Sequence, residues 1–450
     1  MRIRSMIGLW LGRATKFALK ISGRSGTSLP GLVAGKVAPH LLQDLMAQLT
    51  EGVIVTGTNG KTTTTALLYA FLSEEESWLT NRGGANLHQG LLATMMSTST
   101  LSGKLRIRKA VLEVDEATLP KITAFYHPSV ILVTNVLRDQ LDRYGEVDET
   151  LHLLKEGTEY PGTSLITNGD DPLAMSLGIS RSELTYYYGF TQVPEVTSAR
   201  ADVRDGAFCL LCGEELIYDY FIYGQVGAYH CPNGHFQRPV PDFGGKYDGA
   251  TKQLLVEESV SKDNQVYAIA SPVKGIFNQY NLLAAISAAR ILGKSPATIR
   301  KGIVNYEAPT GRFQVFVGTP LRTLALVKNP TGANSVLRAM EEDAGEKVLC
   351  FAINDDDADG RDVSWLWDIN IEEFLPRSFC ETWICTGTRG LDMALRLAYA
   401  GVDRSKINVL DKLSQLVEET SGYVLPVYIL STYTALHPLS ELLRKGVTNG

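Results

Sequence analysis

The stretch Thr56-Gly57-Thr58-Asn59-Gly60-Lys61-Thr62-Thr63 decides the fold. A short apolar run over 52–56 predicts a buried strand before it, and a helical pattern through 66–71 follows it. Glycines let backbone N–H groups approach phosphate oxygens, and a helix N-terminus adds a favourable dipole. In such a loop Lys61 neutralises the β- and γ-phosphates, and the Thr62 hydroxyl holds Mg²⁺. The sequence therefore predicts that Thr56 to Thr63 bind the phosphates of a nucleotide.

The pattern around this loop predicts an α/β protein, because runs typical of buried parallel strands alternate with helical patterns. We assign the central nucleotide-binding domain to 44–310 and a second, C-terminal α/β domain to 311–450. Inside the central domain lies an interruption at about 198–245, which is rich in Tyr, Gly, Cys and Pro and lacks helical periodicity, so we expect a small β-rich insertion there. The predicted strands are 110–114, 130–134, 164–168, 324–327, 347–353, 382–385 and 424–430, and the predicted helices are 281–292, 334–341 and 391–400.

Composition limits the class of protein. The chain has 450 residues, 44% hydrophobic and 20% charged, which suits soluble domains with large cores. Its 43 Lys+Arg against 49 Asp+Glu give a net charge of −6, which argues against nucleic-acid partners. Six cysteines are too few for a disulfide scaffold, so a cytoplasmic location is expected. No apolar run reaches the roughly 18 residues of a membrane span.

The N-terminal region, 1–43, is basic and contains no acidic residue before Asp44. We expect a helix followed by a Gly/Ser/Pro-rich linker at 22–35. The apolar residues of this helix recur at helical spacing, and Arg13, Lys16 and Lys20 occupy another face. Two interpretations stay open: a helix packed on the body with a solvated basic side, or a helix that touches an anionic membrane or a lipid-linked phosphate. The apolar positions are Ile3, Ile7, Trp10, Ala14, Phe17 and Ile21.

Several motifs resemble the Mur ligase family, which uses ATP to activate a carboxylate and joins an amine to it. The loop TGTNGKTT is the first. Glu113 stands where the family carries a Mg²⁺-binding glutamate, so the resemblance assigns Mg²⁺ to Thr62 and Glu113. Asn278 and Asn281 correspond to positions near the adenine, and Arg312 to an arginine that reaches the phosphates. Purely structural roles are the alternatives: Glu113 could be an ordinary carboxylate at the end of a strand, and the two asparagines could cap the helix that follows.

The resemblance narrows to the MurT type, the synthetase subunit of lipid II isoglutaminyl synthase. It rests on the segment 80–87, the cysteine-containing insertion and the acidic segment 354–365. It implies ATP-dependent amidation of the α-carboxylate of D-isoglutamate in lipid II, with ammonia from a GatD-type glutaminase in a heterodimer. It also implies that Asp355, with Asp356 as the alternative, completes the partner's Cys–His pair. A location at the inner face of the membrane follows from the lipid-linked substrate.

The insertion carries a candidate metal site. Cys209 and Cys212 have the spacing of a zinc knuckle, and Cys231 lies 18 residues further on. In MurT relatives the second half reads Cys-Pro-x-Cys-Gly, whereas this chain has Gly234 at the fourth cysteine and His235 beside it. We expect either a structural Zn²⁺ with His235 as the fourth ligand or a ribbon that keeps its fold without zinc.

Two alternatives to this function stay open, although the cysteine insertion, Gln140 and the acidic segment count against the first, an amino-acid-adding ligase. Gln140 replaces the histidine of the family's TN…DHLD segment, and the carbamylated lysine of amino-acid-adding ligases has only a weak candidate in Lys155. A Mur-type or folylpolyglutamate-type ligase that adds an amino acid is one alternative. A nucleotide-binding assembly subunit without catalysis is the other. No cysteine has the flanking glycines of a nucleophile elbow, so ammonia has to come from outside the chain.

Overall fold

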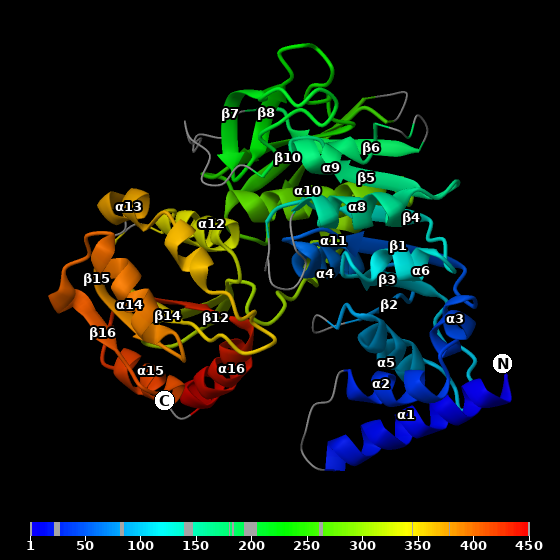
Figure 1. Cartoon of the computed structure of the whole chain (residues 1–450), viewed down its shortest axis with the longest axis horizontal. Coiled ribbons are helices and arrows are strands. Elements are labelled where there is room, and N and C mark those ends of the chain that lie inside the picture. Colours follow the sequence, from blue (N-terminus) through cyan, green and yellow to red (C-terminus); the bar gives the residue numbers. More distant parts are fainter. Residues whose placement is uncertain are drawn as a thin grey trace.

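The computed structural model describes residues 2–21, 28–81, 85–138, 147–179, 181, 184–192, 205–260, 264–343, 345–377 and 379–448. Figure 1 shows two α/β lobes, one built on strands β1 to β11 and the other on β12 to β17. Among the described residues, no helix combines the length and hydropathy that crossing a membrane requires. The α/β prediction is confirmed.

The central lobe is built on a nine-stranded sheet in the order β11-β10-β9-β6-β5-β4-β1-β3-β2. The seven neighbouring strands β9-β6-β5-β4-β1-β3-β2 run parallel, while β10 lies antiparallel to both β9 and β11. The predicted strands at the centre of this sheet are confirmed. The strands are β1 (Glu51–Thr56), β2 (Leu79–Thr80), β3 (Lys109–Glu113), β4 (Val130–Val133), β5 (Ser164–Asn168), β6 (Thr185–Phe190), β9 (Phe243–Asp248), β10 (Gln253–Glu258) and β11 (Gln265–Ala270).

Helices cover both faces of this sheet because alternate residues of each buried strand point to opposite sides. Val53 and Val55 pack under one set of helices, and Ile54 packs under the other. Helices α4 (Lys61–Leu72), α10 (Ile276–Ile291) and α11 (Pro296–Val304) cover the first face. The second face carries α3 (Leu41–Met46), α5 (His88–Thr98), α6 (Leu119–Thr123), α8 (Val147–Thr158) and α9 (Pro172–Ser176).

The N-terminal region is more helical than the sequence predicted. Helix α1 (Ile3–Ile21) is confirmed, but the linker prediction is wrong from Leu29 onward, because α2 (Leu29–Val37) occupies that stretch. Helix α2 begins with Pro30 in its first turn and packs between α1 and α5 (Figure 1). Glycine and proline here permit close helix packing, so they do not mark a flexible linker.

The predicted insertion at about 198–245 contains a separate hairpin and meets the main sheet at its C-terminal end. Strands β7 (Ile217–Tyr223) and β8 (Val226–His230) form a separate antiparallel hairpin. Residues from 243 onward belong to the main sheet, because β9 pairs with β6. The helix predicted at 281–292 begins earlier, at Ile276.

The C-terminal lobe has a six-stranded sheet in the order β12-β13-β17-β14-β15-β16. All its neighbouring strands are parallel except β12 and β13. Its strands are β12 (Gln314–Phe316), β13 (Arg322–Leu326), β14 (Lys347–Ala352), β15 (Cys380–Thr386), β16 (Ile407–Val409) and β17 (Val427–Ser431), and its helices are α12 (Pro330–Glu341), α13 (Ile371–Phe374), α14 (Gly390–Tyr399), α15 (Leu413–Thr420), α16 (Tyr433–Thr448), η1 (Ser364–Asp368), η2 (Leu375–Arg377) and η3 (Arg404–Lys406).

Candidate active site

The predicted phosphate loop connects β1 to α4. Gly57 and Gly60 have φ angles of 112° and 88°, a region that favours glycine. A Cβ on Gly60 would lie 2.1 Å from Oδ1 of Asn281, so the loop and α10 approach too closely for a side chain. Thr58 anchors the loop, since its hydroxyl donates to the carbonyl of Leu137 at 3.0 Å and accepts from the Leu137 amide at 3.0 Å. The sequence therefore sets the loop backbone in a fixed conformation at the N-terminus of α4.

Lys61 is buried under the loop with a carboxylate that the sequence analysis missed. Its Nζ lies 3.0 Å from Oε1 of Glu116, and both side chains are almost fully buried. Nζ also donates to the carbonyls of Gly57 at 2.5 Å and Thr58 at 3.2 Å. Burial raises the pKa of Glu116, while the nearby Lys61 ammonium lowers it. The only sequence signal for Glu116 was its position three residues after Glu113.

Thr62, Glu113 and Arg312 form the second part of the site. Arg312 Nη2 donates to the Thr62 hydroxyl at 3.3 Å, and Glu113 is close enough to raise the pKa of Arg312, which burial lowers. Glu113 is itself buried, and its Oε1 accepts from Asn86 at 2.9 Å. A hydroxyl and a carboxylate are oxygen ligands of the kind that Mg²⁺ prefers, so Thr62 and Glu113 fit this ion.

A cleft of about 680 Å³, including its open mouth, lies between the two lobes beside the loop. The loop residues Asn59, Gly60 and Thr63 line it. Both predicted asparagines, Asn278 and Asn281, line it as well. Arg312 and Phe313 contribute from the other lobe, and the ring centroid of Phe313 is 6.1 Å from that of Phe277 on α10. The cleft therefore brings polar groups of both lobes together beside the phosphate loop.

The alternative role of the two asparagines as helix caps is wrong. Helix α10 begins at Ile276 with Gly275 at its N-cap, so Asn278 and Asn281 lie inside the helix. Asn278 donates to the carbonyl of Lys274 at 2.8 Å, and its Oδ1 accepts from Asn281 at 3.0 Å. The pair is thus held in place on the face of α10 that borders the cleft.

Polar contacts join the two lobes across the cleft. The amides of Asn59 and Asn329 exchange hydrogen bonds at 3.2 Å and 3.4 Å. Asn329 also caps α12, since its Oδ1 accepts from the amide of Gly332 at 2.8 Å. Together with Arg312 and Thr62, these residues place the start of α12 against the phosphate loop.

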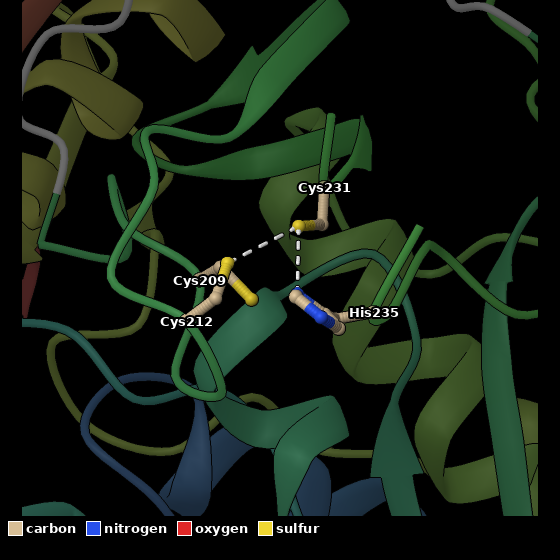
Figure 2. A group of neighbouring side chains, drawn as sticks. All are labelled: Cys209, Cys212, Cys231 and His235. Atoms are coloured by element: carbon tan, nitrogen blue, oxygen red, sulfur yellow. Dashed lines mark hydrogen bonds between the residues drawn. The ribbon is translucent and has the colours of Figure 1, made fainter. Parts of the chain in front are cut away.

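The four predicted metal ligands of the insertion come together. Their ligand atoms all lie within 4.8 Å of one another, and the residues are Cys209, Cys212, Cys231 and His235. Figure 2 shows their side chains converging from two turns. The Cys212 and Cys231 sulfurs are 3.6 Å apart, and the Cys231 sulfur lies 3.7 Å from Nδ1 of His235. Three sulfurs and one imidazole match the donor set of a closed zinc site.

Asp355 lies apart from the cleft lining, just after the carboxyl end of β14. Its Oδ1 accepts from the Thr388 hydroxyl at 2.7 Å, and its Oδ2 lies 3.5 Å from Nε of Arg389. Asp355 is half-buried, whereas Asp356 is exposed. Asp359, further along the same acidic segment, is buried and accepts from the Thr434 amide at 2.8 Å.

The remaining predicted residues are Lys155, Gln140 and the segment 80–87. Lys155 is exposed on α8 and does not line the cleft, so the structure does not bring it to the site. Gln140 lies outside the described residues, as do Arg82, Gly83 and Gly84 of the 80–87 segment.

Comparison with known proteins agrees with this geometry. Residues 326–436 match the family described as MurT ligase C-terminal, and residues 55–209 match the Mur ligase middle domain. The MurT subunit of lipid II isoglutaminyl synthase (glutamine-hydrolyzing) from Staphylococcus aureus strain COL is 33% identical over 100% of both chains. The subunit of the same name from Streptococcus pneumoniae is 34% identical over 98% of both chains.

Solved structures show the same fold at lower identity. A pseudomurein peptide ligase type C from Methanothermus fervidus is similar with a TM-score of 0.67 at 21% identity, over 90% of this chain and 81% of that chain. MurF from Acinetobacter baumannii is similar with a TM-score of 0.62 at 16% identity, over 94% and 81%. The predicted Mur ligase-like fold is therefore confirmed.

Proposed function

Since the chain belongs to the family of MurT subunits of lipid II isoglutaminyl synthase, a group of ATP-dependent Mur-type ligases, we propose that it amidates the α-carboxylate of D-isoglutamate in lipid II. The nitrogen would come as ammonia from a glutaminase partner. The observation that carries this proposal is the inter-lobe cleft, in which the phosphate loop faces Arg312 of the other lobe, and Arg312 hydrogen-bonds to Thr62 of that loop.

The chemistry has two steps. The substrate carboxylate oxygen attacks the γ-phosphorus of ATP, an acyl phosphate forms, and ADP leaves. Ammonia then attacks the acyl carbon, the C–O bond to phosphate breaks, and the nitrogen loses a proton to give the amide. Lys61 and Arg312 are cations placed to stabilise charge on the transferring phosphoryl group. Asn278 and Asn281 offer polar groups to the adenine end of the cleft.

Mg²⁺ fits the Thr62 hydroxyl and the Glu113 carboxylate, and it would supply charge neutralisation between the β- and γ-phosphates. Asn86 and Arg312 position these two ligands through hydrogen bonds to Glu113 and Thr62. Such support fixes ligand orientation.

We propose a structural Zn²⁺ at the cysteine cluster of Figure 2. His235 takes the place of a fourth thiolate, since the shift of one residue from Gly234 still brings an imidazole nitrogen to the sulfurs. Gly234 has a φ of 70°, and a Cβ there would meet no atom within 4 Å. The cluster stands on the hairpin that contributes Tyr223 to the cleft.

The partner we propose is a GatD-type glutaminase that forms a heterodimer with the C-terminal lobe. Asp355 would orient the histidine of the partner's Cys–His pair, as a triad carboxylate does. Its hydrogen bond from Thr388 and its ion pair with Arg389 hold the carboxylate beside the carboxyl end of β14. Because lipid II is membrane-linked, the complex would act in the cytoplasm at the inner face of the membrane.

The test is amidation of lipid II by the complex with its glutaminase partner, with ¹⁵N-labelled glutamine and ATP and mass detection of the product. We expect Lys61→Ala to abolish amidation while the complex still assembles, and Lys301→Ala, an exposed lysine of α11, to leave it unchanged. Asp355→Asn should block glutamine-dependent amidation but keep amidation from ammonium. Ligation of an amino acid without ammonia, or loss of assembly alone in Lys61→Ala, would contradict the proposal.

A further inference from the structure

Helix α1 packs against the domain through its smallest residues. Gly8 and Gly12 are buried, as is Leu9 between them. A Cβ on Gly8 would lie 2.6 Å from Cβ of Ala38, and one on Gly12 would lie 2.9 Å from the carbonyl oxygen of Pro30. Since α2 supplies or flanks both of these neighbours, this side of α1 is the one that faces the protein.

The apolar side of α1 therefore points away from the protein, and the prediction of a packed apolar face is wrong. Ile3 is 79% exposed, Phe17 is 68% exposed and Ile21 is 73% exposed. Successive residues of a helix are rotated by about 100°, so these side chains share a sector of about 120°. We call this sector the exposed stripe of α1, and it consists of Ile3, Ile7, Trp10, Leu11, Phe17 and Ile21.

The exposed stripe continues onto the neighbouring turn. The indole Nε1 of Trp10 donates to the carbonyl of Leu101 at 2.9 Å, and the Leu101 side chain is exposed as well. Figure 1 shows α1 along the rim of the central lobe, with α2 and α5 between it and the sheet. A contiguous apolar surface at the rim of a protein marks an interaction site.

Positive charge borders the exposed stripe. Arg4 lies next to the stripe on one side and Lys20 lies on the other, while Lys16 is on the opposite face of the helix, and all three are exposed. Residues 1–43 contain no acidic side chain. Lys and Arg side chains next to an apolar face can extend their charged ends toward lipid headgroups while their stems remain apolar.

We propose that α1 docks in the plane of an anionic bilayer surface and inserts the exposed stripe among the lipid chains. A second copy of the chain fits worse, because two such faces would bring Arg4 and Lys20 of each copy together, and residues 1–43 offer no acidic partner. Docking through α1 would turn the N-terminal side of the central lobe toward the membrane. The choice of the inner leaflet rests on the proposed function, but the surface itself does not.

The experiment measures co-sedimentation of the full chain with vesicles of phosphatidylglycerol and phosphatidylcholine, without lipid II or nucleotide. We expect Ile7→Glu/Phe17→Glu to weaken binding at least about ten-fold, since it places charge in the inserted face. Val304→Glu/Val424→Glu is the matched control, because both valines are strongly exposed on other surfaces. Lys20→Gln should weaken binding about five-fold at low salt, and Lys16→Gln, on the opposite face of α1, should weaken it less. Vesicles of phosphatidylcholine alone should bind less.

Circular dichroism and nucleotide binding establish that each variant is folded, so a loss of sedimentation reports the surface. Equal binding by Ile7→Glu/Phe17→Glu and the wild type would overturn the proposal. A wild-type dimer that the same variant converts to a monomer would also overturn it, because a second copy would then cover the exposed stripe. Failure of lipid II amidation with vesicle binding intact would count against the proposed function alone.

Discussion

Replacement of Glu116 by glutamine tests whether the Glu116 carboxylate compensates the positive charge of Lys61 before nucleotide binds. The variant keeps the shape of the side chain but removes the charge opposite Lys61. In the structure the Lys61 ammonium lies 3.0 Å from Oε1 of Glu116 and also donates to the carbonyls of Gly57 and Thr58. We expect Glu116→Gln to destabilise the free protein and to increase its stabilisation by Mg²⁺ and a non-hydrolysable ATP analogue.

The magnitude follows from the burial of the pair. The side chains of Lys61 and Glu116 are 8% and 6% exposed, so solvent screens their charges weakly. Removing one partner of a buried pair costs about 3–5 kcal/mol. The amide still accepts a hydrogen bond worth about 1 kcal/mol, which leaves a loss of about 3 kcal/mol. For a domain of this size that loss lowers the melting temperature by roughly 6–12 °C.

The assay is thermal unfolding of the variant with and without the analogue. Phosphate oxygens replace the missing carboxylate, so the analogue should raise the melting temperature more in Glu116→Gln than in the wild type. Glu156→Gln, on the exposed side of α8, is the matched control. An unchanged melting temperature would show that the pair contributes no net stability. A lower melting temperature without the larger ligand effect would refute Lys61 as the phosphate-binding cation.

Three further predictions concern other parts of the molecule. Arg312→Lys should lower kcat for amidation about 10²-fold in steady-state kinetics, since it alters the donor that reaches Thr62, and an unchanged kcat would contradict this. Burial raises the pKa of Asp171 to about 6, so its contribution to the free energy of unfolding is full below about pH 4 and is lost as the pH rises through about 6. Urea unfolding measured across this pH range should show no such decline for Asp171→Asn, and the same decline in the variant would contradict this assignment. His235→Ala should reduce bound zinc from about one per chain to less than half, as measured by elemental analysis, and full retention would remove His235 from the site.

The sequence predicted the central elements of both lobes well because their signals are local and strong. The run over 52–56 followed by the glycine-rich loop leaves little freedom, and β1 with α4 matches it closely. The outer part of the nine-stranded sheet was harder. Strands β10 and β11 join it as an antiparallel extension, and register with a distant strand is not encoded in the periodicity of either one.

The candidate site was predicted where a residue is part of a motif and missed where only the fold creates the contact. Arg312 lies 250 positions from Thr62, yet the two hydrogen-bond, and the resemblance had placed both of them near the phosphates. Glu116 had no motif of its own, and its pairing with Lys61 depends on how the turn after β3 passes under the loop. The apolar pattern of α1 predicted a helix but not which of its sides faces the protein, and the buried glycines decide that.

The way the cleft is built links these observations to mechanism. One wall is the N-terminus of α4, and the other begins with Arg312 and the start of α12, so neither lobe holds a complete nucleotide site. The exchange of hydrogen bonds between Asn59 and Asn329 joins the walls beside the phosphate loop. A ligand that contacts both walls stabilises this arrangement of the lobes. By linkage, any partner that favours the same arrangement through the C-terminal lobe must also tighten nucleotide binding.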